Sequence, residues 1–193
     1  MERLPVSRYY LFTVLAIGGG ILDIGSKHAV FHWSALPWGN AYWIWARHIG
    51  LQKSLNEGAL FGIGQGMVWL FAVISILAAI AIPIWLFRLG AAQDVWLTVA
   101  LGCVMAGIVG NLYDRLGLSG ETWPEPLPRA GERAYAVRDW ILLQWNDRWR
   151  WPNFNLADSF LVVGACLLIV HTFRQPGSKT ITTVEAGEET KTS

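Results

Sequence analysis

Four apolar segments, each long enough to cross a lipid bilayer, constrain the fold of this chain more than any other feature of its sequence. They lie at about residues 9–33, 67–87, 95–113 and 154–173, and a helix needs about 20 residues to span a bilayer. Only 15% of the 193 residues are charged, whereas a soluble chain carries about 25%. We therefore predict an all-α membrane protein in which residues 1–173 form one domain of four transmembrane helices.

The connections between the apolar segments differ in length. Residues 88–94 form a short link that predicts an antiparallel hairpin, whereas residues 34–66 and 114–153 are long. With four spans, both long connections lie on the same side of the membrane, opposite both termini. They contain or border nine of the twelve tryptophans: Trp33, Trp38, Trp43, Trp45, Trp123, Trp140, Trp145, Trp149 and Trp151. Because tryptophan favours the headgroup level, we expect both connections to lie on the membrane surface.

Two stretches of these connections have the composition of β-strands. Residues 42–55 are rich in β-forming residues and partly alternate between apolar and polar types, and residues 134–143 are the second candidate. A small β-containing surface subdomain is therefore expected. Prolines at alternate positions within residues 123–128 exclude a regular helix there, so about 117–136 is predicted to be a surface loop. The polar tail at 174–193 is expected to be disordered.

Charge excludes some functions and leaves the orientation open. The net charge of +1, without a basic stripe, argues against a nucleic-acid partner. Arg3 and Arg8 precede the first span as in a signal peptide, but no small-residue cleavage site follows it. Six basic residues lie on the side of the termini and nine on the side of the long connections, so the charge bias alone does not orient the chain. Cys103 and Cys166 lie within spans and are interpreted as buried apolar residues.

Polar residues occur near one end of every span. Because successive spans run in opposite directions, all of these ends meet at one face of the membrane. A charged side chain at the centre of a span costs about 2.5 kcal/mol or more, so such groups persist when they face one another. One shared polar site is therefore predicted, formed by Asp23, Lys27, Asn56, Asn111, Asp114, Arg115, Asn155 and Asp158.

Five sequence blocks, in this order, resemble the lipoprotein signal peptidase (signal peptidase II) family. They are Asp23–Lys27, Asn56–Phe61, Gly107–Arg115, Val137–Ile141 and Phe154–Ser159. The stretch between the third and fourth blocks is longer than in the family, so the loop at 117–136 is interpreted as an insertion.

The resemblance implies a membrane aspartic endopeptidase that cleaves the signal peptide from diacylglyceryl-modified bacterial prolipoproteins, just before the lipidated cysteine. Asp139 and Asp158 match the catalytic aspartates of the family. The positions that line the site match Asn56, Asn111, Arg115 and Asn155, and the supporting positions match Asp23, Lys27, Gly107, Asp114 and Ala157.

The resemblance also implies a cellular setting. It places the chain in the bacterial inner membrane, with cytoplasmic termini and with the site and the β-containing subdomain at the extracytoplasmic leaflet. The expected partners are membrane lipids and the diacylglyceryl-prolipoprotein substrate, with globomycin-type peptides as inhibitors. We expect the chain to be a monomer.

The implied chemistry is consistent with two carboxyl groups. Carboxyls about 3 Å apart do not both ionise readily and share one proton. The ionised member accepts a proton from water while the protonated member donates to the substrate carbonyl oxygen. This reaction requires neither a metal nor another cofactor.

Several of these residues also have purely structural explanations. Asp23 and Lys27 are four residues apart, so an internal ion pair is favoured over a direct catalytic role. Asp114 and Arg115 have the spacing of a pair at a helix end, and Asp158 that of a helix-capping carboxylate.

The sequence leaves other assignments open for the first catalytic acid, for a metal site and for the function. Asp147 is the rival to Asp139, because that match is made across the insertion. His28 and His32, four residues apart, have the spacing of zinc ligands, although no H-E-x-x-H motif is present. Gly102, Ala106 and Gly110 have the spacing of close helix packing.

The competing functions are a catalytically inactive lipoprotein-binding scaffold and a small ion- or proton-translocating protein. No inverted repeat supports a transporter.

Overall fold

The computed structural model describes residues 3–58, 64–146 and 148–174. Four helices in it are long and apolar enough to cross a membrane: Val6–Phe31, Val68–Arg88, Val95–Arg115 and Leu156–Arg174. The predicted fold class is therefore confirmed, with helix ends within a few residues of the predicted ones. The tail at 175–193, which was expected to be disordered, lies outside the described residues.

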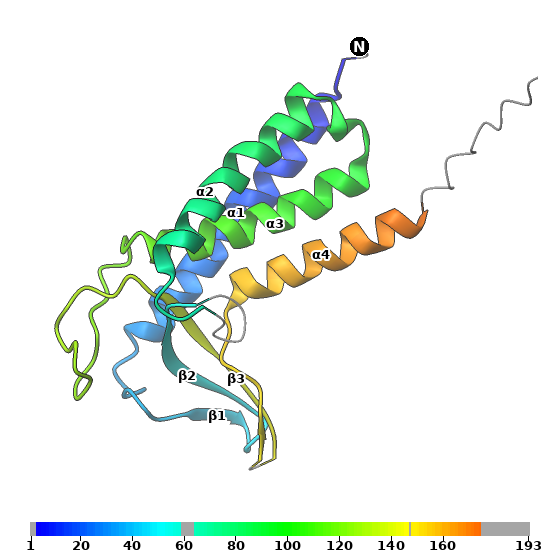
Figure 1. Cartoon of the computed structure of the whole chain (residues 1–193). Helices are drawn as coiled ribbons and strands as arrows, with labels where there is room; N and C mark the ends of the chain where they lie inside the picture. The colour runs from blue at the N-terminus through cyan, green and yellow to red at the C-terminus, as the bar shows by residue number, and fades with distance from the viewer. Residues whose placement is uncertain (1–2, 59–63, 147, 175–193) are drawn as a thin grey trace, which may run out of the picture.

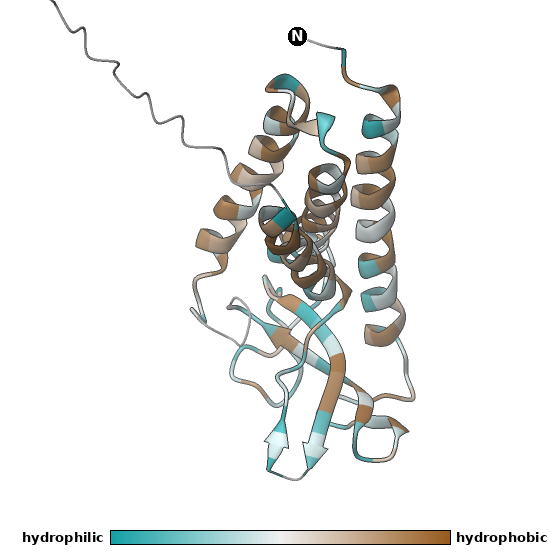
Figure 2. Cartoon of the chain, turned by 90° about the vertical axis from the view of Figure 1, so that its right-hand side faces the viewer, coloured by the Kyte–Doolittle hydropathy of each residue, from teal (hydrophilic) through white to brown (hydrophobic). Residues whose placement is uncertain are grey.

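The third long helix is the centre of the bundle. Helix α3 (Val95–Arg115) lies between α1 (Val6–Phe31) and α4 (Leu156–Arg174), as Figure 1 and Figure 2 show together. Small residues allow this close packing: a Cβ added at Gly107 would lie 2.5 Å from the carbonyl oxygen of Ala157. Cys103 is buried in α3 as predicted, whereas Cys166 on α4 is exposed, because α4 turns most of its surface outward.

The second span is not a regular α-helix throughout. Helix α2 covers Val68–Pro83, and the chain continues as the π-helix η2 at Ile84–Arg88. Proline has no N–H for the helical hydrogen bond, which accounts for the change of pattern at this position. The short 3-10 helix η3 (Ala91–Gln93) and the left-handed Gly90 then complete the predicted hairpin to α3.

The two long connections form one antiparallel sheet at the end of the bundle opposite the N-terminus (Figure 1). Its strands are β1 (Tyr42–Trp45), β2 (Ile49–Asn56), β3 (Val137–Asn146) and β4 (Trp149–Arg150), in the order β1-β2-β3-β4. The predicted strand at 42–55 is thus two strands, separated by a turn in which Arg47 has a φ of 62°. The predicted strand at 134–143 begins three residues later than expected.

The register of β2 against β3 places polar residues at the bundle end of the sheet. Ser54 pairs with Asp139 and Asn56 with Val137, after a register shift between Leu51 and Ser54. Side chains of paired residues lie on the same face of a sheet, so Asn56 and Asp139 share a face. The sheet thereby carries two of the predicted site residues to the ends of α1, α3 and α4.

The loop at 117–136 contains no helix or strand longer than an isolated bridge. Thr122 and Arg133 form that bridge, and the backbone of Trp123 bonds to Glu132 and Gly131. The loop tip is joined to the turn after β2 by an ion pair of 2.8 Å between Arg129 Nη1 and Glu57 Oε1. The loop therefore lies beside the polar end of the bundle.

Candidate active site

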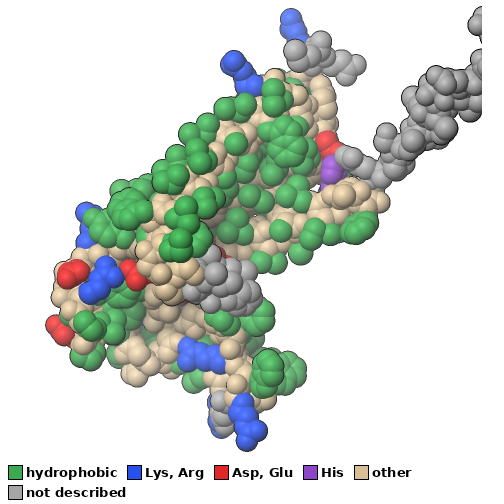
Figure 3. All heavy atoms as spheres, viewed as in Figure 1, with side chains coloured by type: hydrophobic (Ala, Val, Ile, Leu, Met, Phe, Trp, Pro, Cys, Tyr) green, Lys and Arg blue, Asp and Glu red, His purple; other side chains and the backbone are tan. Residues whose placement is uncertain are grey.

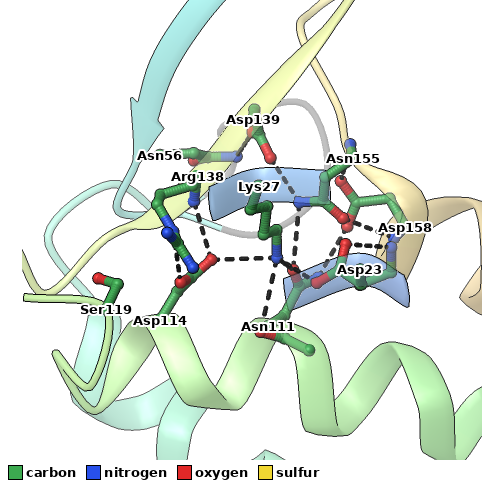
Figure 4. A network of polar contacts seen from close by, with 12 residues as sticks. Asp23, Lys27, Asn56, Asn111, Asp114, Ser119, Arg138, Asp139, Asn155 and Asp158 are labelled. Atoms are coloured by element: carbon green, nitrogen blue, oxygen red, sulfur yellow. Dashed lines mark hydrogen bonds and ion pairs between the residues drawn. The ribbon is translucent and has the colours of Figure 1, made fainter. Parts of the chain in front are cut away.

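Most of the predicted polar site residues lie in one cluster where the sheet meets the helices, and Figure 4 labels Asp23, Lys27, Asn56, Asn111, Asp114, Asp139, Asn155 and Asp158 in it. The last turns of α1 and α3, the end of β2, the start of β3 and the first turn of α4 all contribute to it. These elements are far apart in the sequence, so the cluster exists only in the folded chain. The shared polar site predicted from the ends of the spans is thus present in the structure.

Buried charges form the base of this cluster. Lys27 Nζ lies 2.6 Å from Asp23 Oδ2 and 3.0 Å from Asp114 Oδ2, and all three side chains are 0% exposed. A buried charge is tolerated when it is paired and hydrogen-bonded. The expected ion pair between Asp23 and Lys27 is therefore confirmed, and Lys27 joins two acids from different helices.

Asp114 pairs differently from what its sequence neighbours suggested. Its Oδ1 accepts from Arg138 Nε at 2.8 Å and its Oδ2 from the backbone N of Arg138 at 3.1 Å. The alternative in which Asp114 pairs with Arg115 at the helix end is therefore not the pairing that the structure shows. Arg115 instead donates from Nη2 to the carbonyl oxygen of Gly58 at 3.0 Å, because its side chain points toward the turn after β2.

The start of α4 is capped by residues of the same cluster. Asp23 Oδ1 accepts from the backbone N of Ala157 at 2.8 Å. Asn155 Oδ1 accepts from the backbone N of Asp158 at 2.9 Å, and Asp158 Oδ2 accepts from the backbone N of Asn155 at 3.3 Å. This reciprocal pair is a capping box. The interpretation of Asp158 as a capping carboxylate is therefore correct, and the cap holds this carboxylate within the site.

Three asparagines have amide orientations that their neighbours determine. Asn111 Oδ1 accepts from Lys27 Nζ at 3.0 Å, which leaves its Nδ2 to donate to Asp158 Oδ1 at 2.9 Å. Asn155 Oδ1 accepts a backbone N–H, which leaves its Nδ2 to donate. Asn56 Oδ1 accepts from the backbone N of Gly58 at 2.9 Å. All three amides therefore present N–H donors to the two carboxyl groups.

Asp139 receives two of these donors. Asn56 Nδ2 donates to its Oδ2 at 3.1 Å and Asn155 Nδ2 to its Oδ1 at 2.6 Å. Asn155 contacts both acids, so Asp139 and Asp158 are neighbours joined by one residue. Asp139 is 1% exposed, and burial, with the charge of Asp158 adding to it, raises the pKa of Asp139 to about 8. The Asp139 carboxyl is therefore harder to ionise than a solvent-exposed one.

A cavity of about 280 Å³ opens beside the two acids. Asp158 and Arg115 line it directly, whereas Asp139 adjoins it through the hydrogen bond that it accepts from Asn56, which also lines the cavity. The apolar part of its wall comes from spans α3 and α4 and from Val137 of β3. Its polar and apolar lining fits an extended backbone passing beside a membrane helix, and includes Asn56, Gly107, Ile108, Asn111, Leu161 and Val162.

Arg138 belongs to the cluster although it was not predicted as a site residue. Its side chain is 1% exposed, and it neutralises Asp114 from the face of β3 opposite Asp139. The signal that could have found it was its place next to Asp139 in the block Val137–Ile141. Among the described residues, no group of histidine, cysteine and acidic side chains is placed to hold a metal, so His28 and His32 lack a further ligand there. Asp147, the rival to Asp139, lies outside the described residues.

Comparison with known proteins identifies the family. Residues 15–174 match the family model for signal peptidase (SPase) II. The lipoprotein signal peptidase of Rhodopirellula baltica is 51% identical over 170 residues, which cover 88% of this chain and 74% of that protein. The lipoprotein signal peptidase of Pseudomonas syringae pv. tomato is 39% identical over 123 residues, 62% of this chain and 61% of that protein.

A solved structure supports the fold. A bacterial membrane enzyme determined by the in meso method at 2.3 Å resolution superimposes with a TM-score of 0.70 at 23% identity and covers 99% of both chains. The family model spans most of the chain, including every element that contributes to the polar cluster. This chain therefore belongs to the signal peptidase II family of membrane peptidases.

Proposed function

We propose that this chain cleaves the signal peptide from diacylglyceryl-modified bacterial prolipoproteins, on the N-terminal side of the lipidated cysteine, by activating water with Asp139 and Asp158. The observation that carries the proposal is the buried arrangement in which Asn155 contacts both carboxyls. Family membership supports the substrate class, and the cavity beside Asp158 supports the entry of a peptide backbone.

The two acids have different roles in the proposed reaction. Asp139, whose pKa is raised to about 8, is the proton donor, and Asp158, which lines the cavity, is the proton acceptor. Asp158 accepts a proton from a water molecule as the water oxygen bonds to the scissile carbonyl carbon, and Asp139 donates its proton to the carbonyl oxygen. In the collapse of this intermediate, Asp158 returns its proton to the leaving amine and Asp139 recovers a proton from the diol.

The surrounding residues orient this chemistry. The fixed amides of Asn56, Asn111 and Asn155 hold the carboxyls in place without adding charge. Arg115 lines the cavity, and its Nε is buried without a hydrogen-bond partner among the described residues. A substrate carbonyl in the cavity is a suitable acceptor for it. The arrangement is also supported by the buried residues Asp23, Lys27, Asp114, Gly107 and Ala157.

The proposed setting is the bacterial inner membrane. We infer that the termini are cytoplasmic and that the site lies at the extracytoplasmic leaflet, where a lipid-anchored cysteine would present the bond that follows a signal helix. A monomer contains the complete cluster described above, and globomycin-type peptides are the expected inhibitors.

Purified protein in detergent or liposomes, incubated with a diacylglyceryl-modified prolipoprotein, tests the proposal. We expect wild-type cleavage that globomycin inhibits, and losses of roughly 10²–10⁴-fold in Asp139→Asn and Asp158→Asn. Glu132→Gln, which changes an acid that is 64% exposed, is the matched control and should remain active. Substrate binding without cleavage by the wild type would support the scaffold instead, and full activity in Asp158→Asn would refute the mechanism.

A further inference from the structure

An aromatic cavity lies at the far end of the sheet, away from the polar cluster. Its volume is about 910 Å³. The turn between β1 and β2, the end of β3 and the strand β4 form its walls. Its large apolar side chains are Trp45, Ile49, Leu143, Trp145, Trp149 and Trp151.

The tryptophans of this cavity are too exposed to be a core. Trp145 is 82% exposed, Trp149 is 74% exposed and Trp45 is 63% exposed. A contiguous exposed apolar patch of this kind is typical of an interaction surface. Tryptophan in particular suits the boundary between lipid and water, because its ring is apolar and its N–H is polar.

The same end of the sheet is positively charged. Residues 46–48 and 146–150 contain three arginines and one aspartate. Arg150 lines the cavity, and the partners of its guanidinium among the described residues are the neutral side-chain oxygens of Gln52 and Asn153. Arg148 is exposed beside it. Among the described residues that line the cavity, none is acidic, so the charge favours an anionic ligand.

The position of the sheet brings this cavity to the bilayer surface. The sheet leaves the bundle obliquely, below the first turns of α4, and Figure 3 shows an open recess between the outer surface of α4 and the tip of the sheet. Because α4 is an apolar helix with few buried residues, lipid covers the surface that does not pack against α3. The headgroups of the adjacent leaflet then lie beside α4 at the level of the recess.

We propose that the aromatic cavity binds an anionic phospholipid, with the phosphate at Arg148 and Arg150 and an acyl chain against Trp45, Trp145 and Trp149. A cationic rim around an apolar cavity matches both parts of such a lipid. The bound lipid fixes the free end of β3, whose other end carries Asp139. This proposal concerns the lipid and does not depend on the peptidase reaction.

Tryptophan quenching in nanodiscs tests the proposal with the full chain. Acyl-brominated phosphatidylglycerol and acyl-brominated phosphatidylcholine are added separately, at the same low fraction, to phosphatidylcholine nanodiscs. We expect stronger quenching by the anionic lipid, because it concentrates at the cavity. Each arginine near a membrane surface contributes a preference of roughly fivefold, so Arg148→Gln combined with Arg150→Gln should remove most of the difference.

The matched control is Arg3→Gln combined with Arg88→Gln, which removes two arginines from a cavity at the opposite end of the bundle and should leave the preference unchanged. Loss of the preference in this control, but not in the Arg148/Arg150 variant, would overturn the proposal. Arg148→Gln alone replaces the double variant if the latter does not fold, with a smaller expected loss.

A second measurement, with a prolipoprotein substrate, distinguishes a lipid-binding cavity from a peptide-binding one. Unchanged quenching together with a raised KM in the Arg148/Arg150 variant, measured in nanodiscs without anionic lipid, would identify the cavity as a peptide site and would also overturn the proposal. Failure of the wild type to cleave would refute the proposed function without affecting the quenching result.

Discussion

Replacing Asp139 by asparagine should make the stability of the protein less dependent on pH. The pKa of this carboxyl rises from 3.8 to about 8 on folding, chiefly through burial and then through the charge of Asp158. Between these values the folded state binds a proton that the unfolded chain does not bind, so the free energy of unfolding falls by about 1.4 kcal/mol per pH unit as the pH rises. At pH 7 the wild type has lost roughly 4 kcal/mol relative to a neutral side chain.

Asparagine cannot ionise, so Asp139→Asn removes this slope. It also introduces a constant cost, because Asn56 and Asn155 are both fixed as donors and the NH2 group of the new asparagine has to face one of them, while its oxygen accepts from the other. Loss of one such hydrogen bond costs about 1–3 kcal/mol and does not depend on pH. The pH-dependent change in the free energy of unfolding and the constant loss of stability can therefore be measured separately.

Thermal unfolding in detergent micelles, followed by tryptophan fluorescence from about pH 5 to about pH 8, measures both quantities. The Tm of the variant minus the Tm of the wild type should increase by on the order of 10 °C as the pH rises across this range. Glu132→Gln should parallel the wild type, because its carboxyl is largely exposed. Parallel curves for Asp139→Asn and the wild type would show that Asp139 is ionised in the folded protein, and would refute the assigned proton.

Three further substitutions test the helix packing, the buried charges and the exposed ion pair of the loop. Gly107→Ala should lower stability by about 1–3 kcal/mol, since its Cβ would lie 2.5 Å from the carbonyl oxygen of Ala157, whereas Gly18→Ala, with nothing within 4 Å, should not; thermal unfolding of the two variants checks this. Lys27→Met should cost about 3–5 kcal/mol in the same assay, because two buried acids lose their shared cation, and a loss below about 1 kcal/mol would contradict the ion pairs. Arg129→Gln should cost no more than about 1 kcal/mol, because its ion pair with Glu57 is exposed, and a large loss of activity would show that the loop contributes to the site.

The spans and the face that carries the site followed from the sequence because both depend on local patterns. A bilayer requires about 20 apolar residues per helix, and such runs are visible without long-range information. The polar residues Asp23, Asn111 and Asp158 could be grouped for the same reason, since alternating spans bring their ends to one face.

The partners of these residues were less predictable. Asp114 was expected to pair with its neighbour Arg115, but it bonds to Arg138, 24 residues away in the chain. That choice depends on the register of β3 and on the direction of two side chains at the end of α3, which no local pattern encodes. The division of residues 42–55 into two strands depends on a left-handed turn at Arg47, a residue type that seldom adopts this conformation.

The capping box at the start of α4 has a consequence for which peptides are cut. Asp158 belongs to the first turn of a membrane helix, so under the proposed reaction the water that it activates would lie at a set depth relative to that helix, and one helical turn corresponds to about 5.4 Å. Under the proposed reaction, a signal helix that is longer or shorter by one turn would place its scissile bond out of reach of the two carboxyl groups. The length of the hydrophobic run in a substrate, besides its sequence at the bond, then selects where it is cleaved.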